Sequence, residues 1–258
     1  MIKISLVTIT YNSENTLSDT IRSVLTQTYS EIEYILVDGA SKDGTVKIIK
    51  EYESILGEKL KWISEPDKGL YDAMNKGIRM ATGDVVGIIN SDDFFSSERV
   101  LQQVADSFMN EKELEAVYGD VHYVNSDDLT KCVRYYSSKV FKRELMKFGF
   151  MPAHPSFYIK RKCFEKLGLY KTDYKIAADF EFLLRTIYKG NIKMKYLPID
   201  MVTMRTGGAS SSGWKSHKCI MKEHLRAFRE NGIYTNVFIL SLRYIYKIGE
   251  VLLSKIRY

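Results

Sequence analysis

Cysteine and proline are scarce in this chain. Its 258 residues include only 3 Cys and 4 Pro. The three cysteines, Cys132, Cys163 and Cys219, are odd in number, far apart and form no Cys-x-x-Cys pair, which argues against a disulfide framework and a cysteine zinc site. With 45% hydrophobic and 27% charged residues, the composition excludes collagen-like and disordered classes. We expect a globular protein of a reducing cytoplasm.

Long apolar segments are also missing. Met1 leads directly into an apolar run at residues 2–7, without a basic leader or a small-residue cleavage site, so we expect a strand there and no targeting signal. The longest charge-free stretch near the C-terminus, residues 231–242, is shorter than the roughly 20 apolar residues that cross a bilayer. We therefore expect no transmembrane helix.

The net charge of +6 is concentrated at one end of the chain. Residues 213–258 hold 9 Lys or Arg against 3 Glu, and the remainder is neutral. A globally basic protein would suggest nucleic acid, whereas this distribution predicts contact with an anionic surface from one side. From about Tyr234 the pattern is helical, and its apolar positions are Phe238, Leu242, Ile245, Leu252 and Ile256. The alternative interpretation is a solvated helix with a basic face.

Short β-branched runs alternate with amphipathic segments in the first half of the chain. The runs occupy residues 4–10, 34–37, 60–64 and 85–89. This alternation predicts βαβ units and a mostly parallel sheet. We expect Asn12 and Ser13 to cap the first helix.

The second half has a less regular pattern. It predicts a helix at about 98–109, strands near 116–118 and 156–159, and a helix at about 177–188. Since no linker is visible, we expect these pieces to complete the same sheet. The predicted organisation is one α/β domain over residues 1–212, with a donor half to about 110 and an acceptor half from about 111, followed by a basic lid and helical segment over residues 213–258.

Polar loops follow the four predicted strands of the first half. Ligands of parallel α/β sheets bind at the carboxyl ends of the strands, so we expect these loops to form one site for a flat, polar, anionic ligand. Tyr11 can stack on a base, and Asp38 can accept hydrogen bonds from a base or a ribose. The alternatives are a packed aromatic ring for Tyr11 and a turn former for Asp38.

Asp92 and Asp93 give the more specific signal. Two adjacent carboxylates at the end of a buried strand repel one another unless a positive group compensates them. Mg²⁺ or Mn²⁺ holding a diphosphate suits such oxygen ligands, and the alternative is a plain acidic surface turn. The chain has neither the Gly-x-Gly-x-x-Gly fingerprint in the first turn nor a Walker-type loop, which disfavours redox cofactors and P-loop hydrolysis.

Five motifs in order carry a family resemblance. They are residues 7–12, 37–45, 69–77, 81–84 and 90–93, with further matches at 177–181 and 207–210. Together they resemble family 2 of the inverting glycosyltransferases with the GT-A fold. The resemblance implies a Rossmann-like, mostly parallel central sheet flanked by helices, with a C-terminal helical tail.

The resemblance also implies a nucleotide-sugar donor, most often carrying UDP. Thr10, Tyr11 and Asp38 are then expected around the base and ribose, and Lys68 and Asp72 beside the donor pocket, although a solvent-exposed lysine is the alternative for Lys68. The implied metal motif, residues 90–93, departs from the usual Asp-x-Asp. Its first residue, Asn90, can still bond a ribose. Asp92 is the first candidate ligand for Mg²⁺ or Mn²⁺ and Asp93 the second.

Glycosyl transfer places two demands on the protein. The leaving diphosphate needs its negative charge neutralised, and the acceptor hydroxyl must lose a proton to a general base. The motif at residues 177–181 resembles the family's base motif, so we expect Asp179 to be the base, with Glu181 as second candidate. The alternative for Asp179 is a carboxylate favoured by the helix dipole.

The acceptor side is less well defined by sequence. His154 is expected either to touch acceptor or phosphate or to be structural, and the Gly- and Ser-rich stretch 205–218, holding Trp214, Lys215 and His217, is expected to form a lid. The Gln-x-x-Arg-Trp motif of processive synthases is missing, so we expect transfer of a single sugar.

The predicted function is transfer of one sugar to a lipid-linked glycan acceptor in bacterial surface polysaccharide synthesis. We expect this to occur in the cytoplasm, at the inner face of the membrane, with no nucleic-acid partner. The alternatives are a sugar-phosphate nucleotidyltransferase and a non-catalytic module that binds membrane or nucleic acid. The first would need a Gly- and Arg-rich phosphate loop, which residues 10–16 lack.

Overall fold

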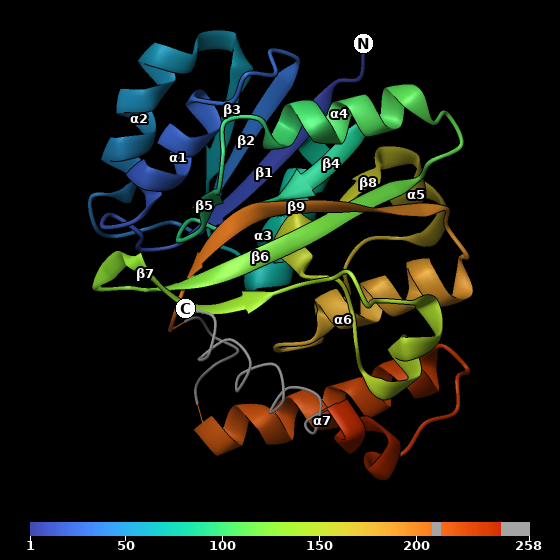
Figure 1. The fold of residues 1–258 in the computed structure, drawn as a ribbon. Helices are drawn as coiled ribbons and strands as arrows, with labels where there is room; N and C mark the ends of the chain where they lie inside the picture. The colour runs from blue at the N-terminus through green and yellow to red at the C-terminus, as the bar shows by residue number, and fades with distance from the viewer. Residues whose placement is uncertain (208–212, 244–258) are drawn as a thin grey trace.

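The protein is built on one nine-stranded sheet. A computed structural model describes residues 1–207 and 213–243. The strand order is β3-β2-β1-β4-β8-β6-β9-β5, and β7 pairs with β6 (Figure 1). The strands are β1 (Ile4–Thr10), β2 (Ile32–Asp38), β3 (Leu60–Ser64), β4 (Val85–Ile88), β5 (Phe94–Phe95), β6 (Ala116–Asn125), β7 (Asp128–Tyr136), β8 (Tyr158–Lys160) and β9 (Met194–Arg205).

Most neighbouring strands of the first half run parallel. β1 pairs in parallel with both β2 and β4, and β2 pairs in parallel with β3. β8 is antiparallel to β4 and to β6, while β6 and β9 are parallel. The predicted α/β fold with a mostly parallel sheet is confirmed, and the chain reverses its strand order beside β1, where ligands of such sheets bind.

Helices cover both faces of the sheet (Figure 1). One apolar cluster packs α1, α2 and α4 against one face, and a second contains α3, α5 and α6 on the other face, with α7 packed on α6. The helices are α1 (Leu17–Leu25), α2 (Thr45–Leu56), α3 (Leu70–Met80), α4 (Val100–Asn110), α5 (Arg161–Leu167), α6 (Ala178–Leu183) and α7 (Gly213–Glu230). A π-helical turn, η4 (Leu184–Lys189), continues α6.

Two of the sequence motifs serve the fold. In α3, a Cβ at Gly77 would lie 2.3 Å from Val7 Cγ1, so only glycine lets α3 approach β1 this closely. In the turn before β4, Thr82 donates its N–H and hydroxyl to the Glu33 carboxylate at 2.8 and 2.7 Å. Burial raises the pKa of Glu33, but hydrogen bonds from Lys61, Ser5 and Thr82 outweigh it and lower that pKa to about 2.

Several predicted elements differ from those observed. The expected strand at 116–118 continues as β6 to Asn125 and turns back into β7. Polar residues recur along both strands, as in an antiparallel hairpin with one face exposed to solvent. β9 was not expected, although it is the longest strand of the described chain. The first helix has Thr16 at its N-cap and no side-chain cap, so the predicted capping by Asn12 and Ser13 is wrong.

The chain beyond α7 is only partly described. Residues 237–243 are helical, with Leu240 fully buried and Phe238 85% exposed. Ile245, Leu252 and Ile256 of the predicted tail helix lie outside the described residues. Within the part of the chain that is described, no helix is both long enough and apolar enough to cross a bilayer. The division of the sheet into donor and acceptor halves stays a prediction.

Candidate active site

The loops that follow β1, β2 and β4 are tied together at one edge of the sheet. Ser41 Oγ accepts the Asn12 N–H at 2.8 Å, and Asn12 Oδ1 accepts the Lys42 N–H at 2.9 Å. Ser13 and Ser91 share a hydrogen bond between their hydroxyls at 2.9 Å. Asn12 and Ser13 therefore join strand-end loops instead of capping α1.

Three predicted nucleotide-binding residues lie at the ends of β1 and β2. Tyr11 is 59% exposed, as a ring available for stacking on a base must be. Thr10 Oγ1 is buried and has no hydrogen-bond partner among the described residues. Asp38 is fully buried, and its carboxylate accepts from the Ser41 N–H at 3.0 Å and the Ser64 hydroxyl at 2.6 Å. In this conformation Asp38 acts as the turn former, and its predicted contact with a nucleotide stays a prediction.

The loop before α3 brings Lys68 and Asp72 beside this edge. The Lys68 N–H donates to Asp72 Oδ2 at 3.0 Å, so Asp72 closes the first turn of α3. The Lys68 side chain is exposed. A Cβ at Gly39 would lie 2.5 Å from an Asp67 carboxylate oxygen and 3.3 Å from the Tyr11 ring, so the loops after β1, β2 and β3 meet at that glycine.

The acidic pair lies after β4, as predicted. Asp93 is 1% exposed, and Asn90 Nδ2 donates to its carboxylate at 2.9 Å. Burial and the neighbouring Asp92 charge raise the pKa of Asp93 to about 8. Burial also raises the pKa of Asp92, which is partly exposed. Asn90 thus bonds Asp93 in this structure, and its predicted contact with a ribose stays a prediction.

Arg205 at the end of β9 holds the acidic loop in place. Its guanidinium donates to the Asp92 carbonyl oxygen at 2.5 Å, pairs with the Asp19 carboxylate on α1 and lies 5.2 Å from the centre of the Phe94 ring. The arginine side chain is 8% exposed. Its charge lowers the pKa of both aspartates, but less than burial raises it.

The chemistry of the acidic pair fits a divalent cation. Two buried or half-buried carboxylates with raised pKa values favour a positive group that lets both ionise. Within residues 1–207 and 213–243, no cluster of three or more His, Cys, Asp or Glu could hold a metal by itself. Mg²⁺ and Mn²⁺ usually retain waters and share phosphate oxygens, so two protein carboxylates suffice when a diphosphate is present.

The predicted base, Asp179, lies at the start of α6. Its Oδ1 accepts the Phe180 N–H at 2.8 Å and the Tyr71 hydroxyl at 3.4 Å. Burial, opposed by these two hydrogen bonds, raises the pKa of Asp179 to about 6. A carboxylate of this pKa is ionised at neutral pH and more basic than an ordinary aspartate, as a general base requires.

Two residues of α3 contact the chain around the start of α6, Tyr71 at Asp179 and Asn75 in the loop before the helix. Tyr71 is 4% exposed, and its single hydroxyl proton is shared between the Asp179 carboxylate and the nearer Ile176 carbonyl just before α6. Asn75 makes two bonds to the backbone of Tyr170, at 2.8 and 3.0 Å. Both residues belong to the motif at 69–77. Tyr71 and Asn75 are four residues apart on α3 and therefore lie on one face of the helix, and this spacing is the sequence pattern that indicates a shared contact.

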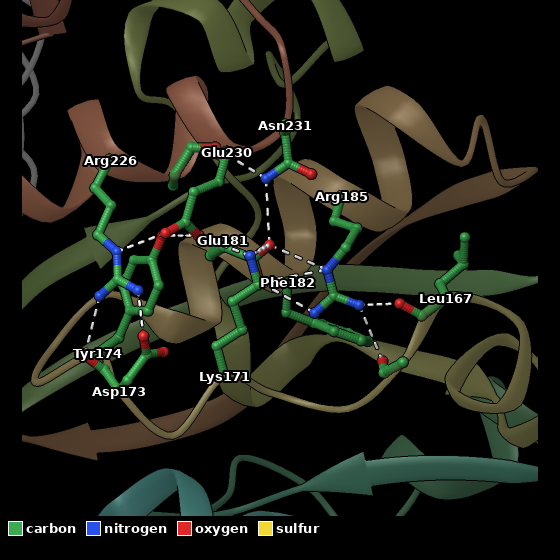
Figure 2. A network of polar contacts seen from close by, with 12 residues as sticks. Leu167, Lys171, Asp173, Tyr174, Glu181, Phe182, Arg185, Arg226, Glu230 and Asn231 are labelled. Carbon is green, nitrogen blue, oxygen red and sulfur yellow. Dashed lines mark hydrogen bonds and ion pairs between the residues drawn. The ribbon is translucent and has the colours of Figure 1, made fainter.

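The structure removes Glu181 as second candidate base. Glu181 is fully buried, and its carboxylate is bound by Arg185 at 3.0 Å, Lys171 at 3.2 Å and Asn231 at 3.2 Å (Figure 2). Arg185 also donates to the carbonyls of Leu167 and Leu169. Glu181 therefore neutralises the partly buried Arg185, which closes the loop before α6, and it is not free to act as a base.

Two expectations for the acceptor side change as well. His154 Nε2 bonds the Tyr170 hydroxyl at 2.8 Å, and burial lowers the pKa of His154 to about 4, so this histidine is structural. Helix α7 begins at Gly213 and includes the Trp214-to-Lys218 part of the expected lid. Residues 208–212 of that stretch lie outside the described residues.

Comparison with known proteins decides the family. Residues 5–168 match the family model described as glycosyl transferase family 2. The chain belongs to this family. It is therefore a glycosyltransferase, and the resemblance of the five motifs is confirmed.

Relatives and solved structures agree with this assignment. A PGL/p-HBAD biosynthesis glycosyltransferase of Mycobacterium bovis is 28% identical over 209 residues, covering 81% of this chain and 78% of the relative. An uncharacterised glycosyltransferase of Mycobacterium tuberculosis is 33% identical over 184 residues, covering 70% of this chain and 68% of the relative.

Two solved structures share the fold. TarS residues 1–349 of Staphylococcus aureus, in complex with UDP-GlcNAc, align with a TM-score of 0.67 and 19% identity over 88% of this chain and 66% of that one. A mannosyltransferase of Pyrobaculum calidifontis, in complex with GDP-Man and Mn²⁺, aligns with a TM-score of 0.65 and 20% identity, over 89% and 64%. This chain thus spans about two thirds of the length of each.

Proposed function

We propose that this glycosyltransferase moves a single sugar from a nucleoside diphosphate sugar, with UDP as the expected nucleotide, to a hydroxyl of a lipid-linked glycan, and that it inverts the anomeric configuration. The observation that carries the proposal is the Asp179 carboxyl. It has a raised pKa and is hydrogen-bonded to Tyr71, in the helix that follows the Asp67–Gly69 loop.

The donor is proposed to bind at the carboxyl ends of β1 to β4. Tyr11 stacks on the base, the buried Thr10 and Asp38 form the wall behind it, and Lys68, Asp72 and Asn90 lie around the sugar and phosphates. The UDP-GlcNAc of the TarS complex and the GDP-Man of the mannosyltransferase are ligands of the corresponding class.

Asp92 and Asp93 are the residues proposed to hold Mg²⁺ or Mn²⁺. An ion there would neutralise charge on the leaving diphosphate. The Mn²⁺ of the mannosyltransferase complex supports this choice. Asp92 is the preferred ligand because it is the more exposed of the two, while Asp93 is bound by Asn90.

Asp179 is proposed to accept the proton of the acceptor hydroxyl as that oxygen attacks the anomeric carbon. Attack on the face opposite the diphosphate forms the new glycosidic bond while the bond to the diphosphate breaks, which inverts the configuration. Tyr71 holds the carboxylate in place, and Arg205 fixes the acidic loop.

A thermal-shift screen tests the donor assignment. UDP, GDP, dTDP and CMP sugars are compared with and without Mn²⁺, because a ligand of the folded state raises its stability by mass action. We expect a UDP-sugar with Mn²⁺ to give the largest increase. A protein unaffected by every nucleotide sugar would contradict the proposal and favour a non-catalytic module.

The second part of the proposal concerns the membrane. Four large apolar side chains around residues 234–242 are at least half exposed: Tyr234, Val237, Phe238 and Leu242. An open hollow of 440 Å³ beside them is lined by Lys147, Phe148, Tyr188, Gly232, Ile233, Tyr234 and Ile239. Exposed apolar side chains within the C-terminal stretch 213–258, which holds the net positive charge of the chain, are suited to the interface of an anionic membrane, where a lipid-linked acceptor resides.

Point substitutions test the membrane contact better than removal of the segment, because Leu240 is part of the core. Phe238→Ser with Leu242→Ser should reduce flotation with phosphatidylglycerol vesicles several-fold while UDP binding persists. Val133→Ser, which alters a half-exposed apolar residue of β7, is the control. Equal flotation of both variants and wild type, or flotation insensitive to salt, would contradict the contact.

A further inference from the structure

The residue that precedes helix α6 has no side chain that could cap it. Its N-cap residue is Ala177, which has no side-chain oxygen to accept the free N–H groups at the start of the helix. Asp179, the proposed base, is the second residue of this helix. The backbone just before α6 therefore determines where the Asp179 carboxylate lies.

Glu223 of α7 supplies the missing acceptor from another part of the chain. Its Oε1 accepts the Lys175 N–H at 2.7 Å, and its Oε2 accepts the N–H groups of Ile176 at 3.0 Å and Ala177 at 2.9 Å. Glu223 is 8% exposed. Three N–H bonds to one buried carboxylate fix three consecutive backbone units, the last of which is two residues before the base.

The next residue of α7 contacts the other side of the same turn. The His224 ring stacks on the Phe180 ring with centroids 3.8 Å apart and an interplanar angle of 11°. Phe180 follows Asp179 in the chain. Helix α7 thus contacts the chain on both sides of the base, at residues 175–177 before it and at Phe180 directly after it.

We propose that Glu223 is a positioning residue of the transfer reaction. It holds the Asp179 carboxylate in place through the backbone of residues 175–177, and its own negative charge acts on that carboxylate. This inference depends on the proposed role of Asp179. It adds that part of the catalytic arrangement comes from α7, outside residues 5–168 that match the family model.

The Glu223 charge has a defined electrostatic consequence. The described groups that act on the Asp179 carboxyl include the Phe180 N–H, the Tyr71 hydroxyl of α3 and Glu223 of α7; Tyr170, in the loop before α6, is affected in turn by the Asp179 charge. The two hydrogen bonds lower the pKa of Asp179, whereas the negative charge of Glu223 raises it. Loss of that charge should make Asp179 a weaker base.

The test compares Glu223→Gln with Glu230→Gln, a variant on the same helix. Glu230 pairs with Lys171 and Arg226 instead of the backbone before α6, so it is a matched control (Figure 2). The Asp179 carboxyl is followed by ¹³C NMR titration and assigned by its loss in Asp179→Asn. We expect Glu223→Gln to lower the Asp179 pKa by about half a unit, to reduce kcat about tenfold or more, and to leave UDP affinity within about twofold.

A Glu223→Gln protein that folds, titrates like wild type and keeps its kcat would overturn the proposal. If that variant does not fold, Glu223→Asp, which keeps the charge but shortens the side chain, should reduce kcat with little change in the titration. Wild-type kcat in Glu223→Asp would then overturn it. A shifted titration together with unchanged turnover in both Glu223→Gln and Asp179→Asn would instead show that the base lies elsewhere.

Discussion

The Tyr71 hydroxyl donates a hydrogen bond to the Asp179 carboxylate at 3.4 Å, and this contact joins the start of α3 to the start of α6. The two residues are 108 positions apart in the chain. The contact connects the helix that follows the donor loop with the residue that we propose to receive the acceptor proton.

Loss of this hydroxyl should move the pH profile upward. In Tyr71→Phe the carboxylate loses a hydrogen bond that lowers its pKa, so the pKa of Asp179 should rise from about 6. The acidic limb of kcat/KM should then lie about half a unit higher in pH. The shift is opposite in sign to the one expected for Glu223→Gln.

Tyr135→Phe is the control for this measurement, because Tyr135 donates to a different buried carboxylate, Asp120, at 2.9 Å. Its profile should match that of wild type. An acidic limb unchanged in Tyr71→Phe would remove Tyr71 from the proposed arrangement.

The acidic loop predicts metal-dependent donor binding. Asp92→Ala should abolish the part of UDP affinity that depends on Mn²⁺ and leave the folded state intact, because a partly exposed loop carboxylate contributes little to stability. In wild type, Mn²⁺ affinity should increase with pH up to about 8, because the ion displaces the proton that the raised pKa keeps on Asp93.

Titration calorimetry with UDP and Mn²⁺ at several pH values measures both effects. Asp127→Ala, at an exposed position after β6, is the control. Wild-type UDP binding that is equally tight without any metal would contradict the role of Asp92.

The sequence was a good guide to the first half of the fold, β1 to β4 with their helices, and to which loops meet. The bounds of β1 to β4 could be predicted because each strand is an apolar run followed by an amphipathic helix, and this pattern is local and repeats along the chain. Asp92 and Asp93 were predicted because two adjacent carboxylates at the end of a buried strand need a compensating charge, and Asp179 was predicted because its motif resembles the family's base motif.

The sequence did not indicate which of the acidic side chains are already bound by other residues of the protein. Glu181 and Asp179 are two residues apart, yet one is bound by Arg185 and Asn231 and the other faces Tyr71. Glu223 and Arg205 were missed because their partners are far away in the chain. Their roles follow from tertiary packing, which leaves no local pattern.

The buried Glu33 predicts an acid limit for stability. In the folded protein its pKa is about 2, below the ordinary value of 4.5, so the folded state keeps Glu33 ionised where the unfolded chain binds a proton. Its contribution is therefore complete above pH 4.5 and is lost as the pH falls from there toward 2.

Urea unfolding between pH 6 and about 3 tests this in wild type and Glu33→Gln. The free energy of unfolding should be lower in the variant at pH 6, and the difference should shrink on acidification. Glu58→Gln, at an exposed position, is the control. Parallel curves for wild type and Glu33→Gln would contradict the role of Glu33.

Asp179→Asn tests the central claim most directly. A coupled assay of nucleoside diphosphate release from the donor that the thermal-shift screen selects is combined with NMR of the anomeric proton in the first product. Because a general base contributes about 10²- to 10⁴-fold to the rate, we expect transfer by the variant to fall at least about 100-fold with near-normal donor affinity. The wild-type product should have inverted configuration. Near-wild-type turnover in Asp179→Asn, or a retained configuration, would contradict the account.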